Sequence, residues 1–241
     1  MYGSTEIDMT RALELLAEKR ERWGIAVTVT HLITRALALA IARHPDTNIK
    51  VRFWGKLEQR KTVDIIVLMA GEGGRDLSAH RIAGADKLSL KEIAVEVIAA
   101  AGRIRRDEDP QFSQSRELVK RLPWWVMRPF LSLASLLINE LHVDLSKVGL
   151  PVDLFGCGMV TSLGMYGIDE GYPPLTPIGR VMVDVLVPRV RDRPWVEDGQ
   201  ISVRPVLKLC ATFDHRMIGG VQAARLNQEM LQLLSAPESL L

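Results

Sequence analysis

The sequence predicts an α/β protein of the α+β kind, in which a mixed β-sheet is covered by helices. Helical patterns dominate the first half of the chain, whereas long apolar strand patterns dominate from Gly156 onward. Turn signals rather than helices separate several of the later strands. A doubly wound parallel sheet would instead alternate strand and helix along the whole chain.

Length and composition limit the class of protein. The 241 residues suffice for one large domain or two small ones. Hydrophobic residues make up 47% and charged residues 25%, which is typical of a folded globular protein. A net charge of +2 provides no strong field for nucleic acid, so we expect no such partner. Without a repeat or a low-complexity linker, we predict a single domain over residues 1–241.

The first part of the chain predicts an edge strand and two helices. Residues 4–8 alternate polar and apolar side chains, as a strand does. A helix is expected to begin at Thr10 and to end at Gly24. A second helix, over residues 30–43, is apolar on almost every side, which is typical of a buried helix.

The middle of the chain predicts short strands followed by a capped helix. We expect the strands at residues 51–54, 62–69 and 78–82. A charged turn around Gly55 would join the first two. Ser89 and Glu92 form the S-x-x-E pattern of a capping box, so a helix should begin there and run to about residue 105.

The last part of the chain predicts long strands and a closing helix. The strands are expected at residues 157–163, 180–188 and 201–213, where Val, Leu and Ile are abundant. Residues 196–199 contain Asp198-Gly199, a hairpin signal between the last two of these strands. A final helix is expected over residues 221–234.

An apolar segment, WWVMRPFLSLASLLI at residues 124–138, predicts a helical insertion at about residues 122–150. Arg128 and Pro129 interrupt it, and a spanning helix needs about 20 apolar residues. We therefore expect no membrane span and do not expect a membrane surface as partner. A helix lying on a membrane stays open as an alternative.

Cysteine usage, histidine spacing and the N-terminus give three further expectations. Cys157 and Cys210 are too few for a disulfide framework, so both should be buried reduced thiols. The first ten residues lack the basic and apolar regions of a secretion signal, which predicts a cytoplasmic location. We expect no metal site, because no HxH or HxxxH spacing joins His31, His44, His80 and His142.

Two segments carry candidate chemistry. In FDHRMIGG, residues 213–220, His215 stands between a strand and a helix, where an imidazole can act as a general base. In TSLGMYG, residues 161–167, Thr161 ends a strand, and its hydroxyl could donate a hydrogen bond to an oxyanion. Taken alone, each segment fits the simpler alternative better: a histidine that ends a strand, and ordinary turn chemistry.

Together, the segments resemble the catalytic domain of the dihydrolipoyl acyltransferases, within the chloramphenicol acetyltransferase-like superfamily. FDHRMIGG resembles the signature DHRxxDG, or HxxxDG in chloramphenicol acetyltransferase, and TSLGMYG resembles S-N-L-G-M-F-G. Further resemblances follow in family order: EIDMT at residues 6–10, VDI at residues 63–65, DKLSLKEIA at residues 86–94 and PWVEDGQISVRP at residues 194–205.

The resemblance implies a homotrimer, or a larger symmetric assembly, with active sites between subunits. His215 would deprotonate an attacking thiol or hydroxyl, and Thr161 of the neighbouring subunit would hydrogen-bond the oxyanion. Acyl-CoA would be the acyl donor, so coenzyme A is the expected cosubstrate, and transfer would be direct. The residues expected to shape the site are Ser162, Gly164, Asp214, Arg216, Gly219 and Gly220.

Three departures from the family pattern qualify this expectation. Gly219 stands where the family has Asp, so an impaired member serving as a trimeric or cage-forming scaffold, or binding a ligand, is the alternative. No lipoyl or subunit-binding domain is visible, so the acceptor would be a separate lipoyl-bearing protein or a small hydroxyl or amine compound. Trp124, Trp125 and Phe130 are expected to line an acyl pocket or a subunit contact, with an extra core helix as the alternative.

Overall fold

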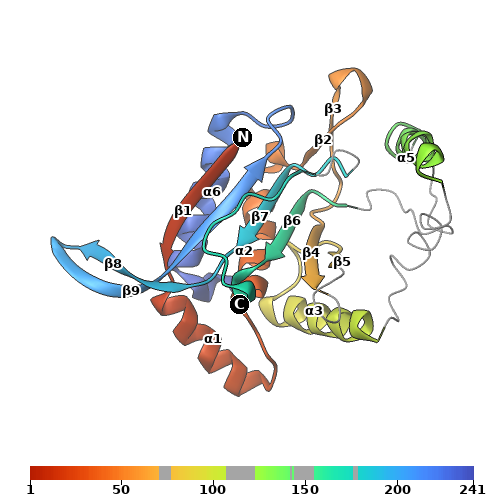
Figure 1. The fold of residues 1–241 in the computed structure, drawn as a ribbon. Coiled ribbons are helices and arrows are strands. Elements are labelled where there is room, and N and C mark those ends of the chain that lie inside the picture. The colour runs from red at the N-terminus through yellow and green to blue at the C-terminus, as the bar shows by residue number, and fades with distance from the viewer. Residues whose placement is uncertain (71–76, 107–122, 142, 144–154, 176–178) are drawn as a thin grey trace.

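A mixed seven-stranded sheet forms the centre of the computed structural model, which describes residues 1–70, 77–106, 123–141, 143, 155–175 and 179–241. The strand order is β1-β9-β7-β6-β4-β5, and β8 pairs with β9 (Figure 1). Strands β4, β6 and β7 are parallel to one another, whereas β5, β8, β9 and β1 pair in antiparallel fashion. The predicted mixed sheet, with an edge strand at the N-terminus, is confirmed. The strands are β1 (Tyr2–Asp8), β4 (Ile65–Ala70), β5 (Leu77–Ile82), β6 (Gly158–Ser162), β7 (Val183–Val187), β8 (Arg191–Glu197) and β9 (Gln200–Phe213).

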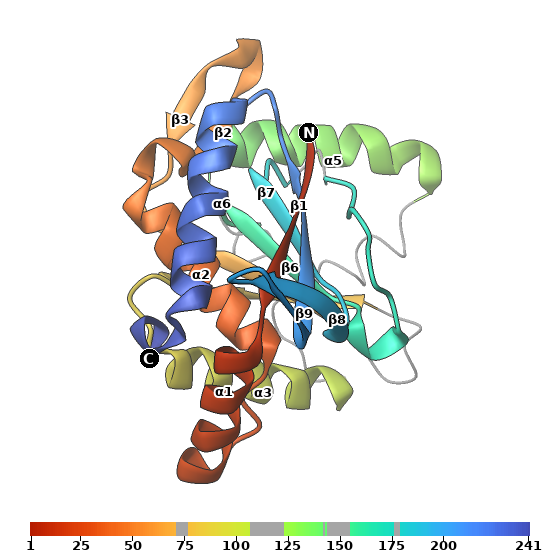
Figure 2. The same cartoon turned by 90° about the vertical axis from the view of Figure 1, so that its left-hand side faces the viewer.

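Helices cover one face of this sheet. They are α1 (Thr10–Trp23), α2 (Val29–Arg43), α3 (Leu90–Arg105) and α6 (Gly220–Ser235). Helix α2 lies between α3 and α6 and packs on β6 (Figure 2). Alternate residues of the central strands, such as Val160 and Val185, point into the core beneath these helices. The opposite face carries a much smaller apolar cluster around Ile66, Met159 and Val181.

The predicted helix ends are present. Gly24 adopts the left-handed conformation, with φ of 67°, and ends α1. At the start of α3, the backbone N–H of Ser89 donates to a carboxylate oxygen of Glu92 at 2.7 Å, and the Ser89 hydroxyl accepts from the Glu92 N–H at 3.3 Å. This is the reciprocal arrangement that the sequence predicts.

Two strand predictions are wrong in detail. Trp54 and Gly55 adopt left-handed conformations, with φ of 63° and 73°, and reverse the chain. As a result, β2 (Ile49–Val51) and β3 (Leu57–Gln59) form a separate two-stranded sheet, and β4 begins only at Ile65. The hairpin at Asp198-Gly199 exists, but its first strand is β8 rather than the strand over residues 180–188.

Helix α5 (Trp124–Asn139) occupies the predicted insertion and lies to one side of the sheet (Figure 1). Its chain continues to Glu140, which accepts hydrogen bonds from Arg52 at 3.0 Å and from Arg180 at 2.7 Å. Trp125 is 65% exposed, so α5 is not a buried core helix in this chain. The predicted insertion lies outside the described residues at positions 142 and 144–150. No helix of the described part is long and apolar enough to cross a membrane.

Both cysteines are free and buried, as predicted. Cys157 begins the turn into β6, and its thiol contacts the carbonyl oxygen of Asp64 at 3.3 Å. Burial raises the pKa of this thiol to about 12. Such a thiol stays protonated at neutral pH and is not a nucleophile, so the cysteines are excluded from the candidate chemistry.

Candidate active site

His215 lies in the tight turn between β9 and α6. The turn is held by the backbone N–H of Asp214, which donates to the carbonyl of Met182 at 2.9 Å. Nδ1 of His215 lies 2.9 Å from the carbonyl oxygen of Ile218. Because a carbonyl oxygen can only accept, Nδ1 carries the proton and Nε2 keeps its lone pair. The side chain is exposed, so this nitrogen is available to a substrate.

The residues on either side of His215 form an ion pair that anchors the turn. Asp214 is buried and accepts hydrogen bonds from the backbone N–H of Arg216 at 3.0 Å and from its side-chain Nε at 2.9 Å. The hydrogen bonds from Arg216 lower the pKa of Asp214, and burial opposes them. Asp214 therefore stays ionised and fixes the backbone around His215.

Gly219 and Gly220 lead directly into α6. Gly219 has φ of −86°, which any residue adopts, and its N–H donates to Oε1 of Gln222 at 2.8 Å. A Cβ atom added at Gly219 would meet nothing closer than 3.9 Å, and one added at Gly220 would meet nothing within 4 Å. Space therefore does not exclude the family's Asp at position 219.

Thr161 lies near the end of β6, on the sheet face opposite the helices. Its side chain is buried, and Oγ1 has no hydrogen-bond partner within the described ranges. Ser162 ends the strand, and a short 3-10 turn follows at Gly164. A Cβ atom on Gly164 would lie 2.9 Å from the carbonyl oxygen of Pro188, so this position needs glycine. The turn thus holds the Thr161 end of β6 close to the end of β7.

His215 and Thr161 of one chain lie at opposite ends of the sheet. Phe213 pairs with Val183, which pairs with Gly158. Thr161 is three residues beyond Gly158 in one direction, and His215 is two residues beyond Phe213 in the other. At about 3.3 Å per residue along the strands and about 4.8 Å between neighbouring strands, their Cα atoms are separated by on the order of 20 Å. The two groups of one chain therefore cannot contact the same reacting atom.

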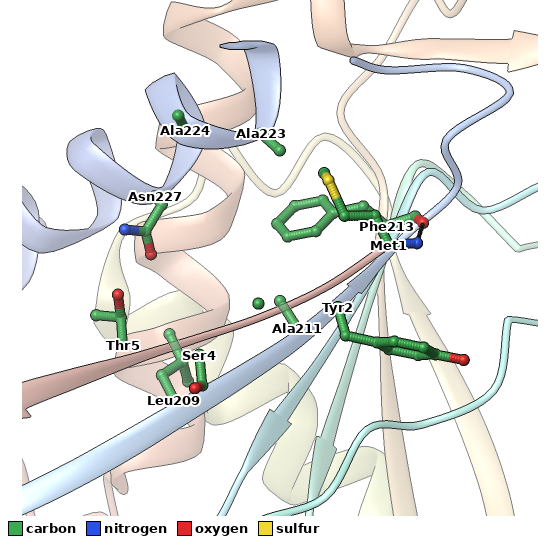
Figure 3. Close-up of a pocket in the computed structure, with 11 residues that line it drawn as sticks. Met1, Tyr2, Ser4, Thr5, Leu209, Ala211, Phe213, Ala223, Ala224 and Asn227 are labelled. Atoms are coloured by element: carbon green, nitrogen blue, oxygen red, sulfur yellow. Dashed lines mark hydrogen bonds between the residues drawn. The ribbon is translucent and has the colours of Figure 1, made fainter. Parts of the chain in front are cut away.

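A pocket of about 200 Å³ lies between β1, β9 and α6, on the helix-covered face (Figure 3). Its lining is mostly apolar and includes Leu209, Phe213 and Ala223, with Asn227 as a polar side chain. Neither Trp125 nor Phe130 of α5 lines it. The pocket begins two residues before His215 and runs away from it along β9.

The apolar residues predicted to form an acyl pocket lie apart from this cavity. Trp125 is exposed and Phe130 is half-buried, whereas the side chain of Trp124 lies outside the described part of the structure. Within the described ranges, no three His, Cys, Asp or Glu side chains gather closely enough to hold a metal ion.

Comparison with known proteins assigns the family. The profile of the 2-oxoacid dehydrogenases acyltransferase (catalytic domain) family matches residues 1–110 and 155–241, which is most of the chain. The chain belongs to this family. The unmatched residues include α5, so the family profile does not extend over the apolar segment. His215, Thr161 and the two glycine-containing turns beside them all lie within the matched residues.

Individual relatives agree with this assignment. Over 246 aligned residues, the chain is 24% identical to the dihydrolipoyllysine-residue acetyltransferase component of the pyruvate dehydrogenase complex of Zymomonas mobilis. This alignment covers 100% of the chain and 46% of the relative, so the acyltransferase-family chain spans about half the length of this curated relative.

Solved structures confirm the fold. A probable dihydrolipoamide acetyltransferase from Listeria monocytogenes matches with a TM-score of 0.73 and 20% identity, covering 98% of this chain and 84% of the other. A chloramphenicol acetyltransferase matches with a TM-score of 0.56 and 11% identity, covering 97% and 87%. At such identities the likeness shows the architecture alone, and it agrees with the fold that the sequence predicts.

A buried polar pair near His215 and Thr161 was not predicted from the sequence. Asp184 of β7 and Thr212 of β9 are each only 3% exposed and lie opposite each other in the register. The signal was present in the sequence, because Asp184 is the one charged residue in VMVDVLV, residues 181–187. A lone acid in a strand that is buried on both faces points to a special environment.

Proposed function

We propose that this family member is a CoA-dependent acyltransferase domain, with His215 as the general base. Its reaction moves an acyl group between CoA and a thiol of the dihydrolipoyl kind, or a small hydroxyl or amine acceptor. The observation that carries the proposal is the hydrogen bond between His215 Nδ1 and the Ile218 carbonyl. This bond leaves Nε2, on an exposed side chain, as the basic nitrogen.

The reaction follows from this tautomer. Nε2 of His215 takes the proton of the acceptor thiol, and the sulfur attacks the carbonyl carbon of the acyl-CoA thioester. The carbonyl oxygen becomes an oxyanion, to which the Thr161 hydroxyl donates a hydrogen bond. When the tetrahedral intermediate collapses, the bond to the CoA sulfur breaks, and the leaving thiolate receives the proton from His215.

The site needs two copies of the chain. Thr161 and His215 of one copy are on the order of 20 Å apart, whereas an attacking sulfur and its oxyanion lie within hydrogen-bond reach of their partners at the same time. A neighbouring copy that brings its Thr161 to this His215 would complete the constellation. The Thr161 hydroxyl favours this arrangement, because Oγ1 has no hydrogen-bond partner among the residues that the structure describes.

Gly219 is compatible with catalysis in this arrangement. The imidazole is oriented by a backbone carbonyl, and the turn is anchored by Asp214 and Arg216. None of these contacts involves a side chain at position 219. The alternative, an impaired member that serves as a trimeric or cage-forming scaffold or binds a ligand, rests on the absence of the family's Asp.

We propose that helix α5 makes a subunit contact rather than lining the acyl pocket. Its exposed residues include Trp125 and Leu133, and its end is held by Glu140. A Trp125→Ala variant should weaken assembly in sedimentation velocity and leave the acyl chain preference unchanged. Unchanged assembly together with a changed chain-length preference would return the segment to the acyl pocket.

The test of the proposed function is acyl transfer from acetyl-, propionyl- and longer acyl-CoAs to dihydrolipoamide and to small thiols, alcohols and amines. Wild type is compared with His215→Ala and with Thr161→Val, which keeps the shape but removes the hydroxyl. Removing the base should lower turnover by about 100-fold or more, and removing the oxyanion donor by about 100-fold. No turnover with any pair, by a folded and oligomeric protein, would favour the scaffold alternative.

A further inference from the structure

Asp184 stands out among the buried side chains of the structure. It lies in β7 and is 3% exposed, and its side chain forms neither a hydrogen bond nor an ion pair with any residue that the structure describes. Leaving a polar group buried without a partner costs about 1–3 kcal/mol, and more for a charged group. Because nothing among the described residues offsets this cost, a bound group that supplies hydrogen bonds would stabilise the side chain.

Two hydroxyl groups on the same sheet face as Asp184 are also buried without a described hydrogen-bond partner. Asp184 is directly opposite Thr212 in the antiparallel pairing of β7 with β9. Thr161 is opposite Leu186, two residues farther along β7, so Thr161 and Asp184 are diagonal neighbours on the same face. Oδ1 of Asp184 and the Oγ1 atoms of Thr212 and Thr161 are all buried, and none has a hydrogen-bond partner in the part of the chain that the structure describes.

The position of this polar group relates it to the proposed reaction. Thr161 is the proposed oxyanion donor, and Asp184 is its diagonal neighbour on β7, with Cα atoms about 8 Å apart. Asp184 and Thr212 therefore lie beside the Thr161 part of a reaction centre whose base would come from the neighbouring copy, on the face that the helices leave uncovered. An acceptor held on this face would keep one end near the polar pair while its reactive end extends along the sheet.

Aromatic rings border the polar group on the side of β1. Tyr2 is opposite Thr212 in the pairing of β1 with β9, and its ring packs edge-on against Tyr172 with centroids 5.4 Å apart. In Figure 3, Tyr2 points to the side of the sheet away from α6, whereas Phe213 points toward α6. Tyr2 is 69% exposed, so this border is open to solvent.

We infer that Asp184, Thr212 and the neighbouring Tyr2 and Tyr172 rings form a subsite for a primary ammonium group of the acyl acceptor. The inference rests on the proposed acyltransferase function and names the acceptor class: a compound that carries an amine besides its reactive thiol or hydroxyl. An ammonium has three N–H donors for the carboxylate and hydroxyl oxygens. The rings add favourable cation–π attraction at the entrance.

The local charges agree with a cationic ligand. Lys208, which precedes Thr212 by four residues in β9, is already paired with Glu170 at 2.6 Å. Burial raises the pKa of Asp184 to about 7, so the carboxyl is about half ionised at neutral pH. A bound ammonium would favour the ionised form and supply the missing partner.

The first arm of the test compares two thiol acceptors of similar size, 2-aminoethanethiol and ethanethiol, with acetyl-CoA as donor and CoA release followed by chromatography. In Asp184→Asn, kcat/KM for 2-aminoethanethiol should fall by about 10- to 100-fold, as expected for losing a charged hydrogen bond. The value for ethanethiol should stay within about twofold. Asp192→Asn, an exposed carboxylate on β8, is the matched control and should change neither.

The second arm does not depend on catalysis. At pH 8, n-propylammonium chloride should raise the melting temperature of the wild type and not that of Asp184→Asn. Tetramethylammonium chloride at the same concentration, a cation without N–H donors, should raise the melting temperature of the wild type less than n-propylammonium does.

The outcomes of the two arms separate the two proposals. A rise in melting temperature with propylammonium, without acyl transfer to either thiol, would overturn the enzyme assignment but support the ammonium subsite. If both thiols accept the acyl group, and the ratio of their kcat/KM values is the same in wild type and Asp184→Asn, the subsite would be overturned and the enzyme assignment supported. The subsite would also be overturned if propylammonium raised the melting temperature of Asp184→Asn, or if it did not raise that of the wild type.

Discussion

The stability of the protein should depend on pH through Asp184, and an Asp184→Asn variant isolates this dependence. Burial raises the pKa of this carboxyl from 3.8 to about 7 in the folded chain. An acid whose pKa is raised on folding contributes stability that is fully present below its unfolded pKa and is lost as pH rises through its folded pKa. The loss should therefore begin near pH 4 and level off above pH 7.

The magnitude follows from the same two values. At about 1.4 kcal/mol for each pH unit, the full loss is on the order of 4 kcal/mol, and the part between pH 5 and pH 8 is about 3 kcal/mol. Asn keeps the size and polarity of Asp but never ionises. The variant should therefore match the wild type near pH 4 and be more stable than it at pH 8.

Urea denaturation followed by circular dichroism at several pH values, at one protein concentration and without amines, measures this difference. The control is Asp192→Asn, whose side chain is exposed on β8 and should leave the curve parallel to that of the wild type. If Asp184→Asn and wild type differ by the same free energy at pH 5 and pH 8, then Asp184 is not a buried carboxyl without a partner, and the reasoning fails.

Three further substitutions test the turns that carry the site. Gly164→Ala places a Cβ atom 2.9 Å from the Pro188 carbonyl, so it should lower the free energy of unfolding by about 1–3 kcal/mol in denaturant titrations; an unchanged midpoint would contradict the close approach. Gly219→Asp has open space and an N-cap position, so it should stabilise α6 by a few tenths of a kcal/mol and leave Nδ1 of His215 on its carbonyl; a loss of folding would show that the turn is tighter than described. Arg216→Ala removes the guanidinium partner of buried Asp214 but keeps the hydrogen bond from the backbone N–H of residue 216, and it should cost about 1–3 kcal/mol at pH 7. Because Arg216 lowers the pKa of Asp214, this cost should fade as pH drops and Asp214 becomes protonated, and an equal cost at pH 3 would rule out the ion pair as its cause.

The sequence predicted the elements whose signals are local. The capping box at Ser89 and the left-handed glycine at Gly24 depend on neighbouring residues, and both were found where expected. The turn around Gly55 was predicted, but the bounds of the strands beside it were wrong, because a tryptophan with positive φ, such as Trp54, has no sequence signature. Local patterns give the ends of elements, whereas an unusual backbone conformation is decided by the packing around it.

The candidate site was predictable in its chemistry but not in its geometry. His215 and Thr161 were found from short motifs, and the strand that ends at each motif is in the expected place. Their separation by two strands and by opposite strand ends comes from the register, which no motif encodes. Asp184 has a sequence signal, a charge within an apolar strand, but only the register shows that Thr212 and Thr161 share its face.

In the proposed site, the backbone orients the base, whereas side chains on the other sheet face would decide which acceptor binds. His215 takes its tautomer from a backbone carbonyl, so position 219 is free to vary without changing the base. The sheet face opposite the helices is different, because there the polar atoms belong to side chains that lack hydrogen-bond partners among the described residues. Substitution of such side chains changes what binds on that face without disturbing the turn that holds the base. The reaction type should therefore follow the His215 turn, and the choice of acceptor should follow residues such as Asp184.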